Sequence, residues 1–204
     1  STTTLLSQSD VLASTVFSFL NINLNSVRDN LHIIDKISLV AISSLFIGVM
    51  GTVPGHELVH RKTSKFDMFI GRWLLSLSWD CAFAIEHVYG HHKNVGLTID
   101  PATARRGENI FKFIIRAIVK EQKDAWKIFF YQNKKRKGSF LSLKNELMTG
   151  YLKSLLVTVS AFAVGGVEGM GIFLLCAFIA KSLLEVINYT EHYGLVRVPG
   201  EKVR

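Results

Sequence analysis

Apolar residues are concentrated in three stretches of the chain that contain few charges. The first, Ile37–Gly55, has nineteen residues and no charged side chain; the others run from about Asn145 to Val164 and from Gly171 to about Asn188. A helix needs about twenty predominantly apolar residues to cross a bilayer. We therefore expect an all-α integral membrane fold with about three transmembrane helices.

A short glycine-rich segment separates the second and third apolar stretches. It covers Gly165–Gly169 and places Glu168 among three glycines. Two small residues four positions apart can form a helix-contact motif, whereas a charged residue among glycines is typical of a turn. We favour a tight turn that joins two antiparallel helices.

The positive charge of the chain is concentrated in one region. The formal net charge is +8, and Lys93–Lys144 holds 13 of the 24 lysines and arginines but only four acidic residues. Aromatic residues recur among these charges, which predicts amphipathic helices on the membrane surface. The positive-inside rule places this region in the cytoplasm. A nucleic-acid patch at Lys134–Lys137 is the alternative, but beside three apolar stretches we expect a solvated face and no nucleic-acid partner.

The composition excludes several other classes of protein. The 204 residues are 49% apolar with a mean hydropathy of +0.27, which excludes a disordered or collagen-like chain. The two cysteines, Cys81 and Cys176, lie in apolar stretches and cannot form a disulfide framework.

Six of the seven histidines lie in three short boxes. The boxes read HELVH at residues 56–60, EHVYGHH at residues 86–92 and NYTEHYG at residues 188–194. Positions i and i+4 of a helix share a face, so His56 and His60 can direct two imidazoles to one point, as can His87 and His91. This grouping predicts a metal site, and neutral imidazole suits zinc, copper, iron and nickel. His32 lies outside the boxes, and we expect it to have no ligand role.

The boxes can share a metal only if they reach the same side of the membrane. The first box ends one apolar stretch, and the second follows Phe66–Ile85, which contains three charged residues. A full crossing by Phe66–Ile85 would separate the two boxes, so we infer that this segment lies at the interface or re-enters. The remaining two crossings then return His192 to the cytoplasmic side.

The last apolar stretch carries one polar stripe. Its members follow helical spacing and are Lys181, Glu185, Asn188 and His192. Charged residues inside a membrane helix usually face a partner or a cavity. Two interpretations stay open: a Lys181–Glu185 pair that only satisfies itself, or a stripe leading to the metal in which Glu185 or Asn188 supports a ligand.

Several kinds of metal chemistry fit parts of this pattern. HExxH at His56–His60 is also the zinc metalloprotease motif, in which Glu57 is the general base. A catalytic zinc needs three protein ligands, and six clustered histidines instead suggest a dinuclear site. Bis-histidine haem uses single histidines from facing helices. A metal transporter would place ligands near the middle of the membrane, whereas these boxes lie at helix ends.

Four motifs together resemble a known family. They are HELVHRK at residues 56–62, EHVYGHH at residues 86–92, DPATARRGE at residues 100–108 and NYTEHYGL at residues 188–195. Across about Gly48 to Arg197 the chain resembles the membrane-bound alkane hydroxylases, or alkane 1-monooxygenases. These belong with fatty acid desaturases and xylene monooxygenases in the histidine-box, non-haem di-iron superfamily. Desaturases typically have tighter HxxHH boxes than the one at His87–His92.

The resemblance implies a specific enzyme. Two non-haem iron ions would be ligated by His56, His60, His87, His91, His92 and His192. The reaction would be O2-dependent terminal hydroxylation of n-alkanes, with electrons from rubredoxin and its NADH-dependent reductase. The location would be the bacterial inner membrane, with the metal on the cytoplasmic side. Asp100 and Glu108 would orient ligands or fix their loop, although a simple turn at Asp100-Pro101 is an equal alternative. A xylene monooxygenase or a fatty acid desaturase or hydroxylase remains an alternative within the superfamily.

The chain departs from this family in two respects. The family has a further histidine box after NYxEHYGL, whereas no histidine follows His192 here. The family fold also has about six spans, including helices before the first box. We therefore expect residues 1–204 to be a single partial domain, internal to a longer hydroxylase and inactive on its own.

Overall fold

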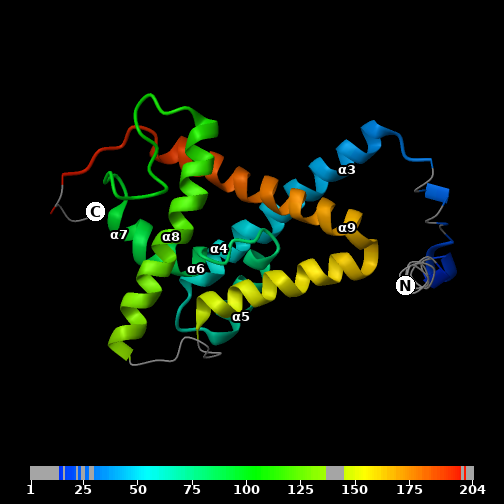
Figure 1. The fold of residues 1–204 in the computed structure, drawn as a ribbon, viewed down its shortest axis with the longest axis horizontal. Helices are drawn as coiled ribbons and strands as arrows, with labels where there is room; N and C mark the ends of the chain where they lie inside the picture. Colours follow the sequence, from blue (N-terminus) through cyan, green and yellow to red (C-terminus); the bar gives the residue numbers. More distant parts are fainter. Residues whose placement is uncertain are drawn as a thin grey trace.

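The computed structural model describes residues 14–15, 17–21, 23, 26–27, 30–136, 145–198 and 200, and every regular element among them is helical (Figure 1). Two of these helices are long and apolar enough to cross a membrane, Ile33–His60 and Glu146–His192. The expectation of an all-helical fold with membrane-type helices is confirmed.

The first long helix is built from three continuous segments. α3 covers Ile33–Phe46, a π-helical segment η1 covers Ile47–Thr52, and α4 covers Val53–His60. Its 28 residues extend about 42 Å at 1.5 Å per residue, which exceeds the roughly 30 Å hydrocarbon core. Most of its side chains are exposed, as expected for a helix that faces lipid.

The second long helix, α9, reverses direction. It covers Glu146–His192 and begins where the Asn145 side chain accepts hydrogen bonds from the backbone N–H groups of Leu147 and Met148. Gly166 has φ 61° and ψ −153°, a left-handed conformation that glycine adopts without a Cβ clash. The two limbs run in opposite directions from this point, yellow and orange in Figure 1. The tight turn expected within Gly165–Gly169 is therefore present.

The segment between the first two histidine boxes does not form a long helix. α5 covers Lys65–Ser76, and its twelve residues extend only about 18 Å. It packs against α4 where Gly55 and Gly71 face each other, so closely that a Cβ at Gly71 would lie 3.1 Å from the Gly55 carbonyl. The following loop is buried, and Trp79 Nε1 donates to Thr158 Oγ1 at 3.0 Å. This geometry agrees with a segment that turns back towards the first box.

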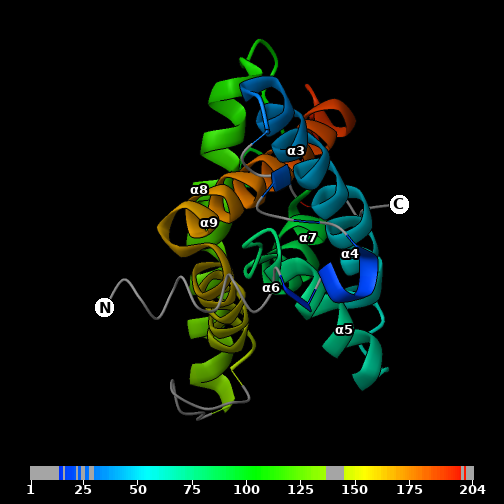
Figure 2. The ribbon, with the colours of Figure 1, turned by 90° about the vertical axis from the view of Figure 1, so that its right-hand side faces the viewer.

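Three short segments and one long helix complete the fold. The short ones are α6 (Phe83–Glu86), the π-helical η2 (His87–His91) and α7 (His92–Asn94). α8 covers Ile110–Arg136 and passes across α9 (Figures 1 and 2). One face of α8 is buried and another exposes both aromatic and lysine side chains, so the predicted amphipathic character is confirmed. Lys137 of the alternative basic patch lies outside the described residues.

Candidate metal centre

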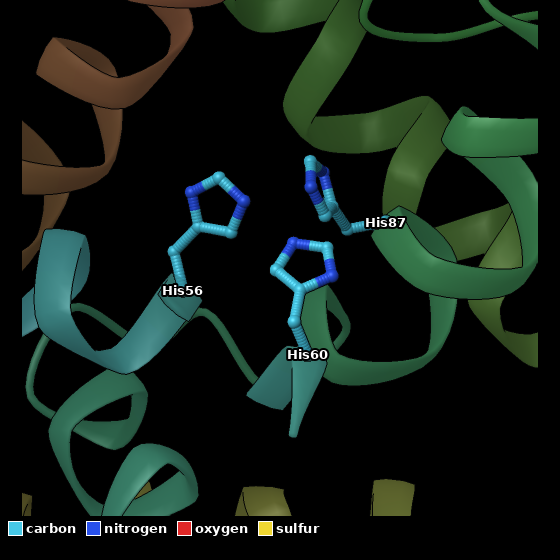
Figure 3. A group of neighbouring side chains, drawn as sticks. All are labelled: His56, His60 and His87. Carbon is cyan, nitrogen blue, oxygen red and sulfur yellow. The ribbon is translucent and has the colours of Figure 1, made fainter. Parts of the chain in front are cut away.

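α4 presents two histidines from the membrane helix to a third on η2. The rings of His56 and His60 lie one helical turn apart, with centroids 4.8 Å from each other. The His87 ring lies 4.5 Å from His56 and 5.3 Å from His60. One ligand nitrogen from each of the three residues lies within 4.8 Å of the others, and Figure 3 shows the rings around one space.

A π-helical turn brings the second box together. In η2 the backbone N–H of His92 donates to the carbonyl of His87, five residues earlier. This wider turn directs His92 as well as His91 towards His87, and the Nε2 atoms of His87 and His92 lie 3.1 Å apart. The i, i+4 spacing expected for an α-helix therefore explains His91 but not His92, because a π-helical turn also brings the residue at i+5 towards His87. Such turns occur frequently at functional sites.

The last two members of the histidine group come from η2 and the end of α9. The ring centroids of His91 and His192 are 4.8 Å apart, and that of His91 is 5.1 Å from His87. The structure thus brings together all six histidines of the three boxes. His32 lies elsewhere, exposed at the start of α3.

The donor set fits a metal better than it fits a hydrogen-bond network. A metal–imidazole bond is about 2.1 Å long, so the ligand nitrogens around one ion are separated by roughly 3 to 4 Å. The ligand nitrogens of His56, His60 and His87 lie within 4.8 Å of one another, so small side-chain movements would bring them to these separations. His192 Nδ1 is also buried without a hydrogen-bond partner among the described residues, which is costly for a polar atom unless something binds it.

Burial keeps two histidines of the second box, His87 and His92, in the form that binds metal. Desolvation lowers the pKa of His87 well below its usual range, and neighbouring histidines, His56 first, lower it further. The pKa of His92 is lowered for the same reasons, with burial as the larger cause. Only neutral imidazole has a lone pair for a metal. Protons therefore compete little with a metal for these two residues at neutral pH.

Asp100 fixes one candidate ligand. Its carboxylate lies 3.0 and 3.1 Å from His91 Nδ1 and accepts a 2.5 Å hydrogen bond from Thr103. Burial alone would raise the pKa of Asp100, but the hydrogen bonds from His91 and Thr103 outweigh it, and the pKa is lowered. A carboxylate on one ring nitrogen leaves the other directed at a metal. The predicted ligand-orienting role of Asp100 agrees with this contact.

Glu108 does not contact a candidate ligand as Asp100 does; it stabilises the loop between α7 and α8. Its carboxylate accepts from Arg116 Nε at 2.6 Å and from Nη2 at 2.9 Å. The same guanidinium donates to the carbonyls of Pro101 and Thr103. Arg116 therefore connects the residues that directly follow Asp100 with Glu108, near the start of α8.

The third box closes over this loop. Tyr189 donates its hydroxyl to the Glu108 carbonyl at 2.7 Å, and the Tyr193 hydroxyl accepts from the backbone N–H of Gly107 at 2.8 Å. The backbone N–H of Gly194 donates to Ala104. These bonds position the end of α9, and His192 with it.

The polar stripe on α9 contacts acidic side chains that sequence analysis missed. Lys181 Nζ lies 2.8 Å from Glu185, 3.0 Å from Asp80 and 2.7 Å from Glu121. The Lys181–Glu185 ion pair is present, but it is not isolated, because Lys181 also contacts Asp80 and Glu121. Asn188 donates to Glu185 at 3.1 Å.

One sequence signal for Glu121 was available. Glu121 continues a series of buried α8 residues at four-residue spacing, namely Phe113, Ala117, Ala125 and Phe129. A glutamate in an apolar stripe predicts a buried partner. Asp80 gave no comparable signal.

The geometry around Glu57 bears on the zinc protease alternative. The Glu57 side chain is 70% exposed and pairs with Arg61 at 3.9 Å. It is not part of the group formed by His56, His60 and His87. A general base of a metalloprotease must reach the metal-bound water, and this glutamate faces solvent instead.

These features define a helical membrane protein with a histidine-rich candidate metal centre. The sequence pattern of the fatty acid desaturase family matches residues 37–203, and the chain belongs to this family.

Comparison with characterised proteins narrows the resemblance. The chain is 38% identical to alkane 1-monooxygenase 1 of Pseudomonas aeruginosa over 78% of its length, and 35% identical to the alkane 1-monooxygenase of Acinetobacter baylyi over 83%. It is 31% identical over 76% to the xylene/toluene monooxygenase hydroxylase component of Pseudomonas putida. The chain spans about 41% of the length of the first two relatives and 42% of the third.

Proposed function

We propose that the protein catalyses O2-dependent terminal hydroxylation of n-alkanes to 1-alkanols at a non-haem di-iron centre. The observation that carries this proposal is the gathering of six histidines from four helical segments in a chain of the desaturase family. Its similarity to alkane 1-monooxygenases indicates the substrate class.

Six imidazoles would hold the two irons: His56, His60, His87, His91, His92 and His192. Iron would supply the activation of O2, and the side chains of this chain would hold the metal, orient it and exclude water. Asp100 would keep the His91 ring in the metal-binding tautomer. Phe83 would form an apolar wall, because its ring stacks on His87 with centroids 4.2 Å apart.

The proposed membrane arrangement has three crossings. Ile33–His60 makes the first, and the two limbs of α9 make an outward and a return crossing around Gly166. This topology puts His60, His192 and the basic segment on one side, which we propose is the cytoplasmic side of the bacterial inner membrane. We propose rubredoxin, reduced by its NADH-dependent reductase, as the electron donor on that side. The apolar substrate would enter from lipid.

Catalytic turnover tests the substrate. The full-length protein in lipid nanodiscs, with rubredoxin, its reductase and NADH, should convert an n-alkane to the 1-alkanol only when O2 is present. Oxidation of a xylene methyl group but not of alkanes would favour the alternative of a xylene monooxygenase. The 31% identity to the xylene/toluene monooxygenase hydroxylase component supports this alternative. An unsaturated acyl product would favour a desaturase.

Metal analysis tests the centre independently of the substrate. We expect about two irons per chain, lost on replacing His192 with alanine as readily as on replacing His56. His32→Ala is the matched control, because His32 lies outside the histidine group, and it should keep both irons. One zinc that persists in the His192→Ala variant, with Glu57-dependent peptide cleavage, would overturn the oxygenase proposal. Oxygen-independent ion transport into vesicles would favour a transporter.

A further inference from the structure

One buried lysine is shared by three buried carboxyl groups close to the histidine group. Lys181 on α9 is 5% exposed, and its ammonium lies within 3.0 Å of Asp80, Glu121 and Glu185. These three residues are 1%, 5% and 0% exposed, and they come from the α5–α6 loop, α8 and α9. We call these four residues the Lys181 cluster.

The charges in the Lys181 cluster do not balance. Three ionised carboxylates and one ammonium would leave a net charge of −2 away from water, and like charges at such distances are not all ionised together. Burial raises the pKa of Asp80, and although Lys181 opposes this, the charge of Glu185 adds to it. Burial and the other carboxyls also raise the pKa of Glu121. Both shifts agree with a proton held within the cluster.

A second observation points to the same proton. Asp80 Oδ1 is buried and has no hydrogen-bond partner in the part of the chain that the structure describes. An ionised carboxylate would lose the hydration of this oxygen with nothing in exchange, whereas a carboxyl group that carries a proton loses much less.

The neighbouring titratable groups supply no compensating cation. They come from the surrounding elements and are Arg72 on α5, Cys81 in the loop, Glu86 on α6, and Glu146, Tyr151 and Lys153 on α9. Of the two cations, Arg72 is already paired with Glu146 at 2.6 Å, and the Lys153 ammonium lies 5.7 Å from the centroids of the Phe69 and Trp73 rings. Glu86 adds a further buried carboxyl.

The Lys181 cluster lies directly behind the candidate metal centre. Lys181 Nζ is 5.9 Å from the centroid of the Phe83 ring, and that ring in turn contacts the stacked His87 ring at 4.2 Å and the His56 ring at 5.1 Å between centroids. A single aromatic side chain therefore separates the ammonium from a candidate ligand. No other group of buried carboxyls with a shared cation occurs among the described residues.

We propose that the Lys181 cluster is a buried proton store that supplies the metal centre during oxygen chemistry. This inference rests on the proposed function, because hydroxylation of an alkane consumes O2, two electrons from an external one-electron donor and two protons, and yields the alcohol and water. At least one of these protons would leave a carboxyl O–H bond of the cluster and end in the water formed. The electron pair of that bond stays on the carboxylate, which Lys181 stabilises until solvent restores the proton.

Infrared spectroscopy tests the store without any turnover. The full-length protein in nanodiscs, with and without iron, should show the carbonyl stretch of a buried protonated carboxyl at pH 7, displaced in D2O. Glu121→Gln removes one carboxyl at nearly constant volume, so the band should shrink or vanish. Glu168→Gln is the matched control, because Glu168 is exposed at the turn of α9, and it should leave the band unchanged. Absence of the band from the native protein would overturn the proton store whether or not the protein is an oxygenase.

Turnover then tests what the proton is used for. Glu121→Gln should bind iron normally, lower alkane hydroxylation about 100-fold and enlarge the solvent deuterium isotope effect. Glu121→Asp should restore both in part. A Gln variant that keeps native turnover and isotope effect, or that loses iron, would overturn proton supply and leave a structural role. A native protein that shows the band but hydroxylates nothing would instead contradict the proposed function.

Discussion

The carboxylate of Asp100 lies 3.0 Å from Nδ1 of His91, nine residues earlier in the chain. The two residues sit on different elements, since His91 ends a π-helical turn and Asp100 lies in the loop before α8. Thr103 and the backbone N–H of Ala102 hold the carboxylate in place. Through this contact, the position of the loop determines the orientation of the His91 imidazole ring.

Replacing Asp100 with asparagine should weaken metal binding. An amide can donate to Nδ1 and stabilise the tautomer that carries its proton on the metal-facing nitrogen. Loss of such a carboxylate partner typically costs 10- to 100-fold in metal affinity, so we expect iron affinity to fall about 10- to 100-fold. Competition with a calibrated chelator, followed by elemental analysis, measures this change.

Asp124→Asn is the control for this experiment. Asp124 pairs with Lys127 on α8 at 2.7 Å, and its replacement should leave iron affinity as it is. Equal affinity in the Asp100 and Asp124 variants would show that the carboxylate does not orient His91.

Gly71→Ala should disturb the support of the first histidine box. A Cβ at this position would lie 3.0 Å from Leu58 Cβ and from Val59 Cγ1 and 3.1 Å from the Gly55 carbonyl. α4 would have to move away from α5, at a cost of about 1–3 kcal/mol. Thermal unfolding in detergent should show a lower midpoint, and iron content should fall with it.

Gly171→Ala tests whether this effect comes from crowding. Nothing lies within 4 Å of a Cβ at Gly171, and alanine favours a helix over glycine by up to about 1 kcal/mol. The Gly171 variant should therefore be as stable as the native protein or slightly more so. If both variants lost stability equally, close approach of α4 and α5 would not be the cause.

Local patterns made much of the fold predictable. Runs of apolar residues determine long helices through short-range preferences, so the helical regions from Ile37 and from Asn145 were expected. The charged Glu168 among the glycines of Gly165–Gly169 marked the turn, and the structure places it at Gly166, because glycine adopts positive φ at little cost. The i, i+4 spacing of His56 and His60 was sufficient to place both rings on one face.

Other features depend on contacts that no local pattern reveals. The π-turn that directs His92 at His87 is a backbone choice that the residue types alone do not specify. Asp80 lies 101 residues before Lys181, and only the packing of the loop on α9 brings them together. Contacts between residues so far apart in the sequence depend on the whole fold, so the sequence alone did not predict the Lys181 cluster.

Acid should loosen the loop that carries Asp100. The hydrogen bonds from Arg116, partly opposed by burial, hold the pKa of Glu108 below its ordinary 4.5. A carboxyl whose pKa is lower in the folded than in the unfolded protein stabilises the fold fully above the unfolded value, and this contribution is lost as pH falls through the folded value. When the pH falls from 6 to below 4.5, the free energy of unfolding should therefore decrease more in the native protein than in the Glu108→Gln variant. Parallel stability curves for the two proteins over this range would contradict the prediction.

Cysteine labelling of the full-length protein in intact cells tests the three-crossing arrangement. The two cysteines within residues 1–204, Cys81 and Cys176, are buried, so they give little background. Glu168 lies just after the Gly166 turn and Lys134 near the end of α8, and both are exposed. A membrane-impermeant maleimide should label Glu168→Cys from outside, because the turn joins an outward and a return crossing. It should reach Lys134→Cys only after the membrane is opened, because the basic segment stays in the cytoplasm. The reverse pattern would place the histidine group outside, away from the proposed NADH-dependent electron donors, and both the topology and the assignment of rubredoxin as partner would then be wrong.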